Sequence, residues 1–114
     1  MRVCIPTDSP GGPASPVADS FQESDLFDFY ELGDDGRFDL YVQIRNCAGT
    51  CKDDVETVAR RGAQVVIVNE VSANYLHRFA KSGISVYRAL GGPSEDSIAA
   101  LHDKRLSELS RIKS

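Results

Sequence analysis

The stretch QVVIVN at residues 64–69 decides the fold class of this chain. A nearly continuous apolar run of this length is expected of a central strand that is covered on both faces. The segments on either side of it, residues 50–62 and 72–83, instead repeat their apolar residues at helical spacing. We therefore predict a helix before and after this strand, and a layered α/β fold.

Both predicted helices carry start or stop signals. Thr50 with Asp53 resembles a capping box, and Ser72 is a favoured N-cap residue. Gly83 is expected to close the second helix, because glycine readily adopts the conformation that ends helices. The apolar stripes are Cys51, Val55, Val58, Ala59 and Gly62 in the first helix, and Ala73, Leu76, Phe79 and Ala80 in the second.

Residues 26–32 and 38–45 are predicted to form a β-hairpin around the turn sequence GDDG at residues 33–36. In the second arm apolar and polar residues alternate. Because side chains alternate between the two faces of a strand, we predict that the apolar ones share a face. They are Phe38, Leu40, Val42 and Ile44.

The ends of the chain supply two further strands, at residues 2–6 and 84–89, and a third helix. We predict that Ser94 caps this helix, after the chain break at residues 91–93. Residues 104–114 either continue the helix or fray. The predicted organisation is one domain over residues 1–103, followed by a C-terminal helical extension or tail at residues 104–114. The third helix's apolar stripe is Ile98, Leu101, Leu109 and Ile112.

The loop after the first strand is rich in residues that disfavour regular structure. Residues 9–16 contain three prolines and two glycines. We predict that residues 9–20 form a mobile surface segment, which becomes ordered when a ligand binds.

Composition narrows the class of protein. With 114 residues, 41% hydrophobic and 26% charged, the chain fits one soluble globular domain. It shows neither a membrane-length apolar stretch nor a secretory leader, so we expect a cytoplasmic protein. A net charge of −4 with scattered cations does not suit nucleic acid. The three cysteines do not suggest a disulfide framework, and Cys4 is expected to be a buried apolar group.

Four segments, in order, carry a family resemblance: MRVCIPTD at residues 1–8, PVADSF at 16–21, GAQVVIV at 62–68 and GISVYR at 83–88. In this order and spacing they resemble the dinitrogenase iron-molybdenum-cofactor biosynthesis family, whose small domains bind or carry metal-sulfur clusters and their precursors. The resemblance implies a ribonuclease-H-like motif, a mixed five-stranded sheet of order 3-2-1-4-5 with strand 2 antiparallel and helices on both faces.

The resemblance also indicates a site at one end of the sheet. Family members commonly have a Ser-x-His-Phe-Gly pattern after strand 1 and Gly-Asn-Ile-Gly after strand 4. Here Ser20 stands in place of the histidine, Phe21 matches, and both glycines after strand 4 are absent. The residues expected to contact a cofactor are Thr7, Asp8, Ser20, Phe21, Asn69 and Glu70.

Two thiols are candidates for metal ligands. Cys47 and Cys51 lie in the loop where the family is often rich in Gly and His. If Thr50 is the N-cap, Cys51 begins a helix, whose dipole stabilises a thiolate. Two incidental thiols, or an oxidisable pair, remain alternatives. His77 and His102 are expected at the edges of helices rather than as ligands.

The leading hypothesis is a non-enzymatic accessory or carrier protein that binds an iron-sulfur cluster, or an iron-molybdenum-type cofactor or its precursor. A partner protein would receive this cargo. One alternative is an interaction or regulatory module that retains the fold without a metal ligand. A further alternative is a metal-dependent hydrolase that uses Asp8 and Glu70, which follow strands 1 and 4. A link with nitrogen fixation is left open.

Overall fold

The computed structural model describes residues 1–46 and 54–109. The strands in these ranges are β1 (Arg2–Thr7), β2 (Leu26–Leu32), β3 (Phe38–Arg45), β4 (Val65–Val68) and β5 (Ser85–Arg88). The helices are α1 (Asp54–Arg60), α2 (Ala73–Lys81) and α3 (Ser94–His102). The capping signal predicted for α1 lies outside the described residues. None of these helices has the length and apolar character needed to span a bilayer.

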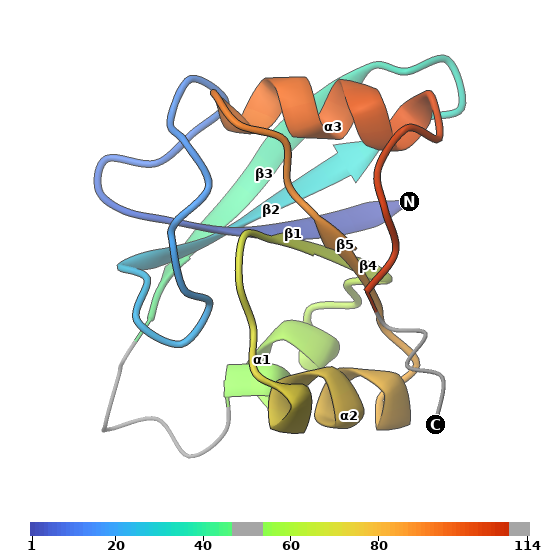
Figure 1. The fold of residues 1–114 in the computed structure, drawn as a ribbon. Helices are drawn as coiled ribbons and strands as arrows, with labels where there is room; N and C mark the ends of the chain where they lie inside the picture. Colours follow the sequence, from blue (N-terminus) through green and yellow to red (C-terminus); the bar gives the residue numbers. More distant parts are fainter. Residues whose placement is uncertain (47–53, 110–114) are drawn as a thin grey trace.

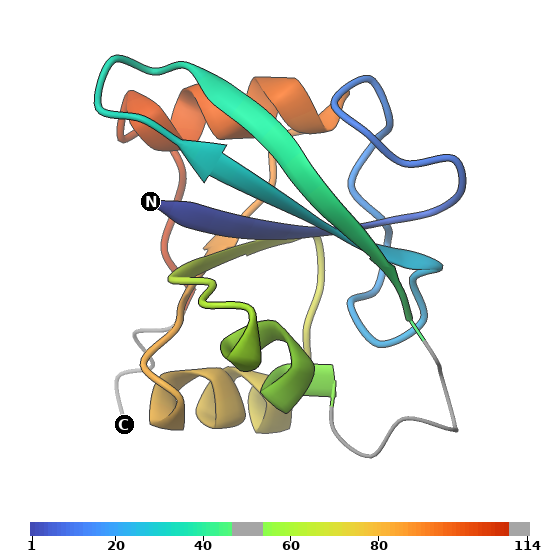
Figure 2. The ribbon, with the colours of Figure 1, turned by 180° about the vertical axis from the view of Figure 1, so that it is seen from behind.

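The strands form one sheet in the order β3-β2-β1-β4-β5. β2 is antiparallel to both of its neighbours, whereas β1, β4 and β5 run parallel. α3 covers one face of the sheet, and α1 and α2 cover the other (Figure 1 and Figure 2). The structure thus confirms the mixed five-stranded sheet with helices on both faces, and the strand order that the family resemblance implied.

β4 contributes to two hydrophobic cores, one on each face of the sheet. Val66 and Val68 pack on the side of α1 and α2, while Val65 and Ile67 pack on the side of α3. All four are buried, which explains the unbroken apolar run. Cys4 is buried beside Val66, and burial raises the pKa of its thiol well above the usual value. It is an apolar core residue, as predicted.

A β-bulge corrects the prediction for β3. Phe29 of β2 pairs with Val42, but its neighbour Tyr30 pairs with Leu40, so that the pairing skips Tyr41. As a result Leu40 packs on the α3 side and Val42 on the opposite side. The prediction that the alternating apolar residues share one face is wrong, because the extra residue reverses the alternation. Phe38 lies with Leu40, and Ile44 lies with Val42.

α2 begins as predicted, and two residues of its predicted stripe, Leu76 and Phe79, pack against the core. Ser72 is its N-cap, and the Ser72 hydroxyl accepts a hydrogen bond from the Tyr75 amide at 3.3 Å. Phe79 is buried and Tyr75 half-buried, whereas the predicted core residues Ala73 and Ala80 are exposed. The reason is that aromatic rings, which bury more surface than alanine, turn this helix toward the sheet.

The start of α3 also differs from the prediction. Its N-cap is Pro93, and Ser94 is the first helical residue. The Ser94 hydroxyl and amide both donate to the carbonyl oxygen of Ser15, at 2.7 and 2.8 Å. Ser94 therefore ties the helix to the loop after β1 instead of capping the helix.

α3 ends at His102 in a Schellman motif. The Lys104 amide donates to the Leu101 carbonyl, and the Arg105 amide donates to the Ala100 carbonyl. Lys104 has φ of +61°, in the left-handed region where glycine is usual. The chain therefore turns back at Lys104, and the helix does not continue over residues 104–109.

Residues 105–109, which we call the strap, run antiparallel along the outer edge of β5. Leu106 packs on the α3 side of the sheet, whereas Leu109 packs on the side of α1 and α2. The predicted stripe of α3 is thus correct for Ile98 and Leu101 and wrong for Leu109, while Ile112 lies outside the described residues.

The two histidines occupy peripheral positions. His77 is exposed on α2. His102 Nε2 lies 2.9 Å from the Asp34 carbonyl oxygen in the hairpin turn, where the missing side chain of Gly36 leaves room for the ring. The bond to that carbonyl, followed by the contact with Asp103, raises the pKa of His102. His102 thus fastens α3 to the hairpin.

We expect Lys104→Gly to stabilise the protein by about 0.5–1 kcal/mol. The left-handed conformation costs a residue with a side chain about 1–2 kcal/mol, and the extra freedom of glycine in the unfolded chain offsets part of the gain. Denaturant unfolding measures the change. The matched control is Lys81→Gly at the end of α2, which should destabilise the protein because glycine is unfavourable in a helix. An equal loss of stability for Lys104→Gly would show that Lys104 is not strained.

Candidate functional site

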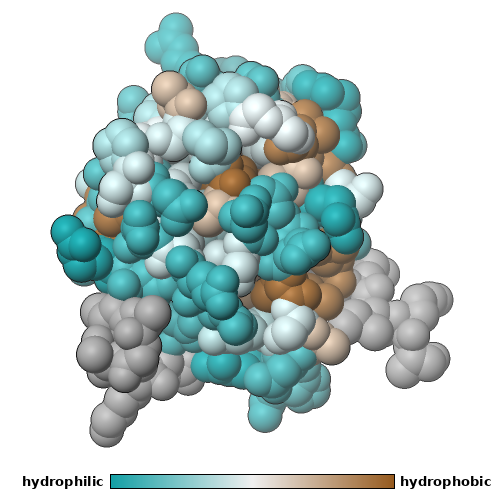
Figure 3. Space-filling view, turned by 60° about the vertical axis from the view of Figure 1, so that its left-hand side comes forward, coloured by the Kyte–Doolittle hydropathy of each residue, from teal (hydrophilic) through white to brown (hydrophobic). Residues whose placement is uncertain are grey.

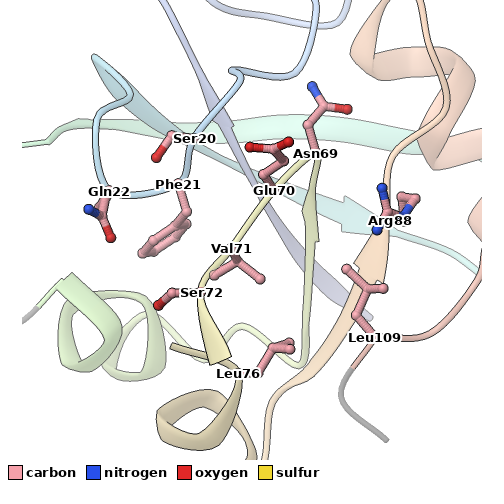
Figure 4. Close-up of a pocket in the computed structure, with 10 residues that line it drawn as sticks. All are labelled: Ser20, Phe21, Gln22, Asn69, Glu70, Val71, Ser72, Leu76, Arg88 and Leu109. Atoms are coloured by element: carbon pink, nitrogen blue, oxygen red, sulfur yellow. The ribbon is translucent and has the colours of Figure 1, made fainter. Parts of the chain in front are cut away.

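An open pocket of about 440 Å³ lies where β4 and β5 end and α2 begins (Figure 4). The carboxyl ends of parallel strands meet at this edge of the sheet, the usual location of ligand sites in open α/β folds. The lining residues are Ser20, Phe21, Gln22, Asn69, Glu70, Val71, Ser72, Leu76, Arg88 and Leu109.

Four of the residues predicted to contact a cofactor come together in this pocket. Ser20 and Phe21 come from the loop after β1, and Asn69 and Glu70 follow β4. The two segments lie side by side, because Ser20 and Glu70 form a parallel β-bridge. In Figure 4 the side chains of Ser20, Glu70 and Arg88 surround the same hollow.

The other predicted residues are not brought to the pocket. Thr7 is fully buried, and its hydroxyl donates to Asp28 at 3.1 Å. The Asp8 carboxylate accepts the Asp25 amide at 3.3 Å. Because Asp8 does not line the pocket that contains Glu70, the acid pair considered for a hydrolase is not assembled there. Cys47 and Cys51 lie outside the described residues.

Sequence reasoning missed three kinds of lining residue. Gln22, Val71 and Ser72 adjoin predicted residues, so a wider window would have included them. Arg88 ends β5, which is parallel to β4, and a search of all parallel strand ends would have found it. Leu109 carried no such signal, because it reaches the pocket through the strap.

Asn69 positions the two pocket loops relative to each other. Its side-chain amide donates to the carbonyl oxygens of Val17 and Ala18, at 3.0 and 3.2 Å. These bonds join the end of β4 to the segment that leads into Ser20. A residue expected to contact the cofactor therefore also holds the backbone of the site.

Phe21 forms the apolar floor of the pocket. It is only 1% exposed, and its ring stacks on Phe27 with centroids 4.8 Å apart. The rings of Phe79 and Tyr75 meet it edge-on, at 5.1 and 5.6 Å. The Tyr75 hydroxyl in turn donates to Asp54 at 2.8 Å, which joins the start of α1 to this cluster. The floor is thus rigidly packed.

The loop over residues 9–20 is fastened to the sheet rather than left without packing. The Asp28 carboxylate is completely buried and accepts hydrogen bonds from the Gly12 amide at 2.7 Å and from the Gln43 side chain at 2.9 Å. Val17 and Ala18 are 5% exposed. The premise that this segment has little to pack is therefore wrong: a buried charge and two apolar residues hold it.

Gly11 is required by the same arrangement. It has φ of +72°, and a Cβ there would lie 2.6 Å from Gln43 Nε2 and 3.0 Å from an Asp28 oxygen. Only a residue without a side chain lets the loop approach the carboxylate this closely.

The chemistry of the lining is polar on one side and apolar on the other. Glu70 and Arg88 are exposed and oppositely charged, and neither side chain has a hydrogen bond or ion pair with another described residue. Hydroxyl and amide groups stand beside them, and Val71, Leu76 and Leu109 supply apolar surface. The described ranges hold no cluster of three or more His, Cys, Asp or Glu side chains able to bind a metal ion.

Comparison with known proteins places this geometry in a family. The family model described as dinitrogenase iron-molybdenum cofactor matches residues 1–104. The chain belongs to this family. As a member, it departs from the expected pattern at Ser20, where histidine is usual. No curated protein sequence matches it.

Solved structures share the whole fold of this family member. PH0822 is 25% identical with a TM-score of 0.81, over 95% of this chain and 94% of its own. A candidate NifB protein from Thermotoga is 25% identical with a TM-score of 0.75, over 99% and 97%. The apo form of the orange protein from Desulfovibrio gigas is 16% identical with a TM-score of 0.77, over 95% and 92%, and shows the fold alone.

We expect Asp28→Asn to destabilise the protein by about 1–3 kcal/mol. The amide group would place a donor against the Gly12 amide or the Gln43 side chain, and leave a buried group without its bond. Denaturant unfolding gives the stability, and hydrogen exchange of the Gly12 amide should accelerate. Asp39→Asn, on the exposed side of β3, is the control. Equal midpoints for the two variants would show that the loop does not depend on Asp28.

Proposed function

We propose that this chain is a non-enzymatic accessory protein that binds an iron-sulfur cluster, or an iron-molybdenum-type cofactor or its precursor, and delivers it to a partner protein. One observation carries the proposal. In a member of the iron-molybdenum cofactor family, residues from separate loops converge on one pocket, at the positions where the family resemblance places its cofactor loops.

The pocket suits a cluster that brings its own sulfide ligands. Its volume of about 440 Å³ lies in the range of small-ligand sites. The Arg88 guanidinium and the side-chain amide of Gln22 are hydrogen-bond donors for anionic sulfides, and Val71, Leu76 and Leu109 offer apolar contact. Glu70 is the one carboxylate of the described lining, and no thiol or imidazole accompanies it there. Soft protein ligands must therefore come from elsewhere.

Cys47 and Cys51 remain the predicted source of soft ligands. β3 ends at Arg45, which pairs with Leu26, and Leu26 pairs with Thr7 at the end of β1. The chain therefore leaves β3 at the edge of the sheet that carries the pocket. This placement supports the thiol hypothesis.

The proposal also covers the fold class, the location in the cell and the biological process. The strand order, with β2 antiparallel, supports assignment to the ribonuclease-H-like motif. The net charge of −4, with cations scattered along the sequence, supports a cytoplasmic role without nucleic acid. Membership of the family supports a relation to nitrogen-fixation chemistry, with a protein as the recipient of the cargo.

A second candidate is a regulatory module that kept the fold and lost its metal ligand. Ser20 favours it, because a hydroxyl replaces the imidazole expected at this position. Uptake of iron and sulfide separates the two proposals.

We expect anaerobically prepared protein to take up iron and sulfide, and Cys47→Ala with Cys51→Ala to abolish the uptake. Metal and sulfide analysis, with the absorption spectrum, measures it. Cys4→Ala is the control, since Cys4 is a buried apolar residue. No uptake by the parent would favour the regulatory module. Equal uptake by parent and double variant would make the thiols incidental.

We further expect Ser20→His to retain iron at least about tenfold more tightly, the smaller end of the effects seen when metal sites are altered. The imidazole would enter the pocket that Ser20 already lines. Competition with a chelator measures the affinity. Asp19→His is the control, because this exposed neighbour does not line the pocket. Equal gains from both variants would place binding elsewhere.

A further inference from the structure

The outer edge of β5 offers a defined surface for another chain. Figure 3 shows a face covered mostly by hydrophilic residues, with apolar groups only in small patches. A sheet edge can bind another chain without a large apolar patch, because its unpaired amides and carbonyls form hydrogen bonds with an extended segment that runs alongside. β5 is such an edge, and the strap now covers it.

The strap imitates a sixth strand, and two backbone hydrogen bonds join it to β5. The Arg88 amide donates to the Ser107 carbonyl at 2.9 Å, and the Leu109 amide donates to the Val86 carbonyl at 2.6 Å. Between these bonds, Tyr87 faces Glu108. The strap's side chains at 105, 107 and 108 are exposed.

Two half-buried leucines hold the strap from opposite sides of the edge. Leu106 packs with Tyr87 on the α3 side, and Leu109 packs on the other side, where it also lines the pocket with Leu76 and Arg88. In Figure 4, Leu109 lies directly beside Arg88. Removing the strap from β5 therefore removes part of the pocket wall.

The connection from α3 to the strap contains one strained residue. Lys104 occupies the left-handed region at φ +61°, which is strained for a residue with a side chain. Straightening the chain at this residue relieves that strain. The strap is therefore joined to the domain by a turn in which two backbone hydrogen bonds, from the Lys104 and Arg105 amides, offset the strain at Lys104.

We propose that the outer edge of β5 is a strand-addition surface for a receiving protein, and that the strap occupies it until that partner displaces it. The partner is an extended segment with apolar residues three apart, one for each face of the sheet, as in Leu106 and Leu109. Its addition would withdraw Leu109 and open the pocket. This opening rests on the proposed carrier function, whereas strand addition does not.

The first experiment uses the full chain without metal. The variant Leu106→Asn with Leu109→Asn loosens the strap, and Ser107→Asn is the matched control. Hydrogen exchange of the Arg88 amide should accelerate at least tenfold in the loosened variant alone, with β4 amides unchanged. A labelled peptide of residues 104–109 should bind this variant at least tenfold more tightly than the parent, and slow the Arg88 exchange again.

Several outcomes would overturn strand addition. They are unchanged Arg88 exchange, failure of the peptide to bind, or equal binding of a peptide with asparagine at both leucine positions. If the double variant loses its near-ultraviolet circular dichroism, Leu109→Ala replaces it with the same expectations.

The second experiment tests the opening of the pocket. Protein loaded anaerobically with iron and sulfide is mixed with excess chelator, and the loosened variant should release iron at least fivefold faster than Ser107→Asn. Equal rates would overturn the coupling. If the parent takes up no iron, the carrier function and the coupling both fail, while the peptide result alone decides strand addition.

Discussion

The buried carboxylate of Asp28 is the constraint on which the site depends. It lies in β2 and accepts hydrogen bonds from Thr7 of β1, from Gln43 of β3 and from the Gly12 amide. A buried charge is costly unless its oxygens are satisfied, so these donors are held in place once the sheet forms. Three strands and the loop after β1 are thereby joined at one point.

Further hydrogen bonds connect the loop that Asp28 holds to the pocket. The loop held at Gly12 continues into Val17 and Ala18, whose carbonyls accept the side chain of Asn69. Ser20 is then set beside Glu70 in a β-bridge. Apart from the buried Phe21, the residues that line the pocket are exposed or half-buried, but hydrogen bonds hold the backbone beneath them. The arrangement is a preformed site rather than one that a ligand must assemble.

The position of the pocket and the residues that line it have different origins. Its position follows the strand order of the sheet, and its charged lining, with Glu70 opposite Arg88, suits a ligand that is held by hydrogen bonds and apolar contact. The strap adds a wall that two backbone hydrogen bonds join to β5 and two leucines join to the cores. This wall lies at the sheet edge, where an added strand would have to replace the contacts that Leu106 and Leu109 make with the two cores.

The sequence by itself determined the elements and much of the site. Unbroken apolar residues marked β4 and alternation marked the hairpin, because these signals are local. The family resemblance, carried by short sequence motifs, predicted Ser20, Asn69 and their neighbours. Only the tertiary structure decided the bulge at Tyr41, the bonds to Asp28 and the path of the strap. Each of these joins residues far apart in the chain. Leu109 has a helical spacing from Leu101, yet it packs in the other core. The turn at Lys104 ends the helix, and the strap then forms hydrogen bonds with backbone groups at the edge of β5, which need partners.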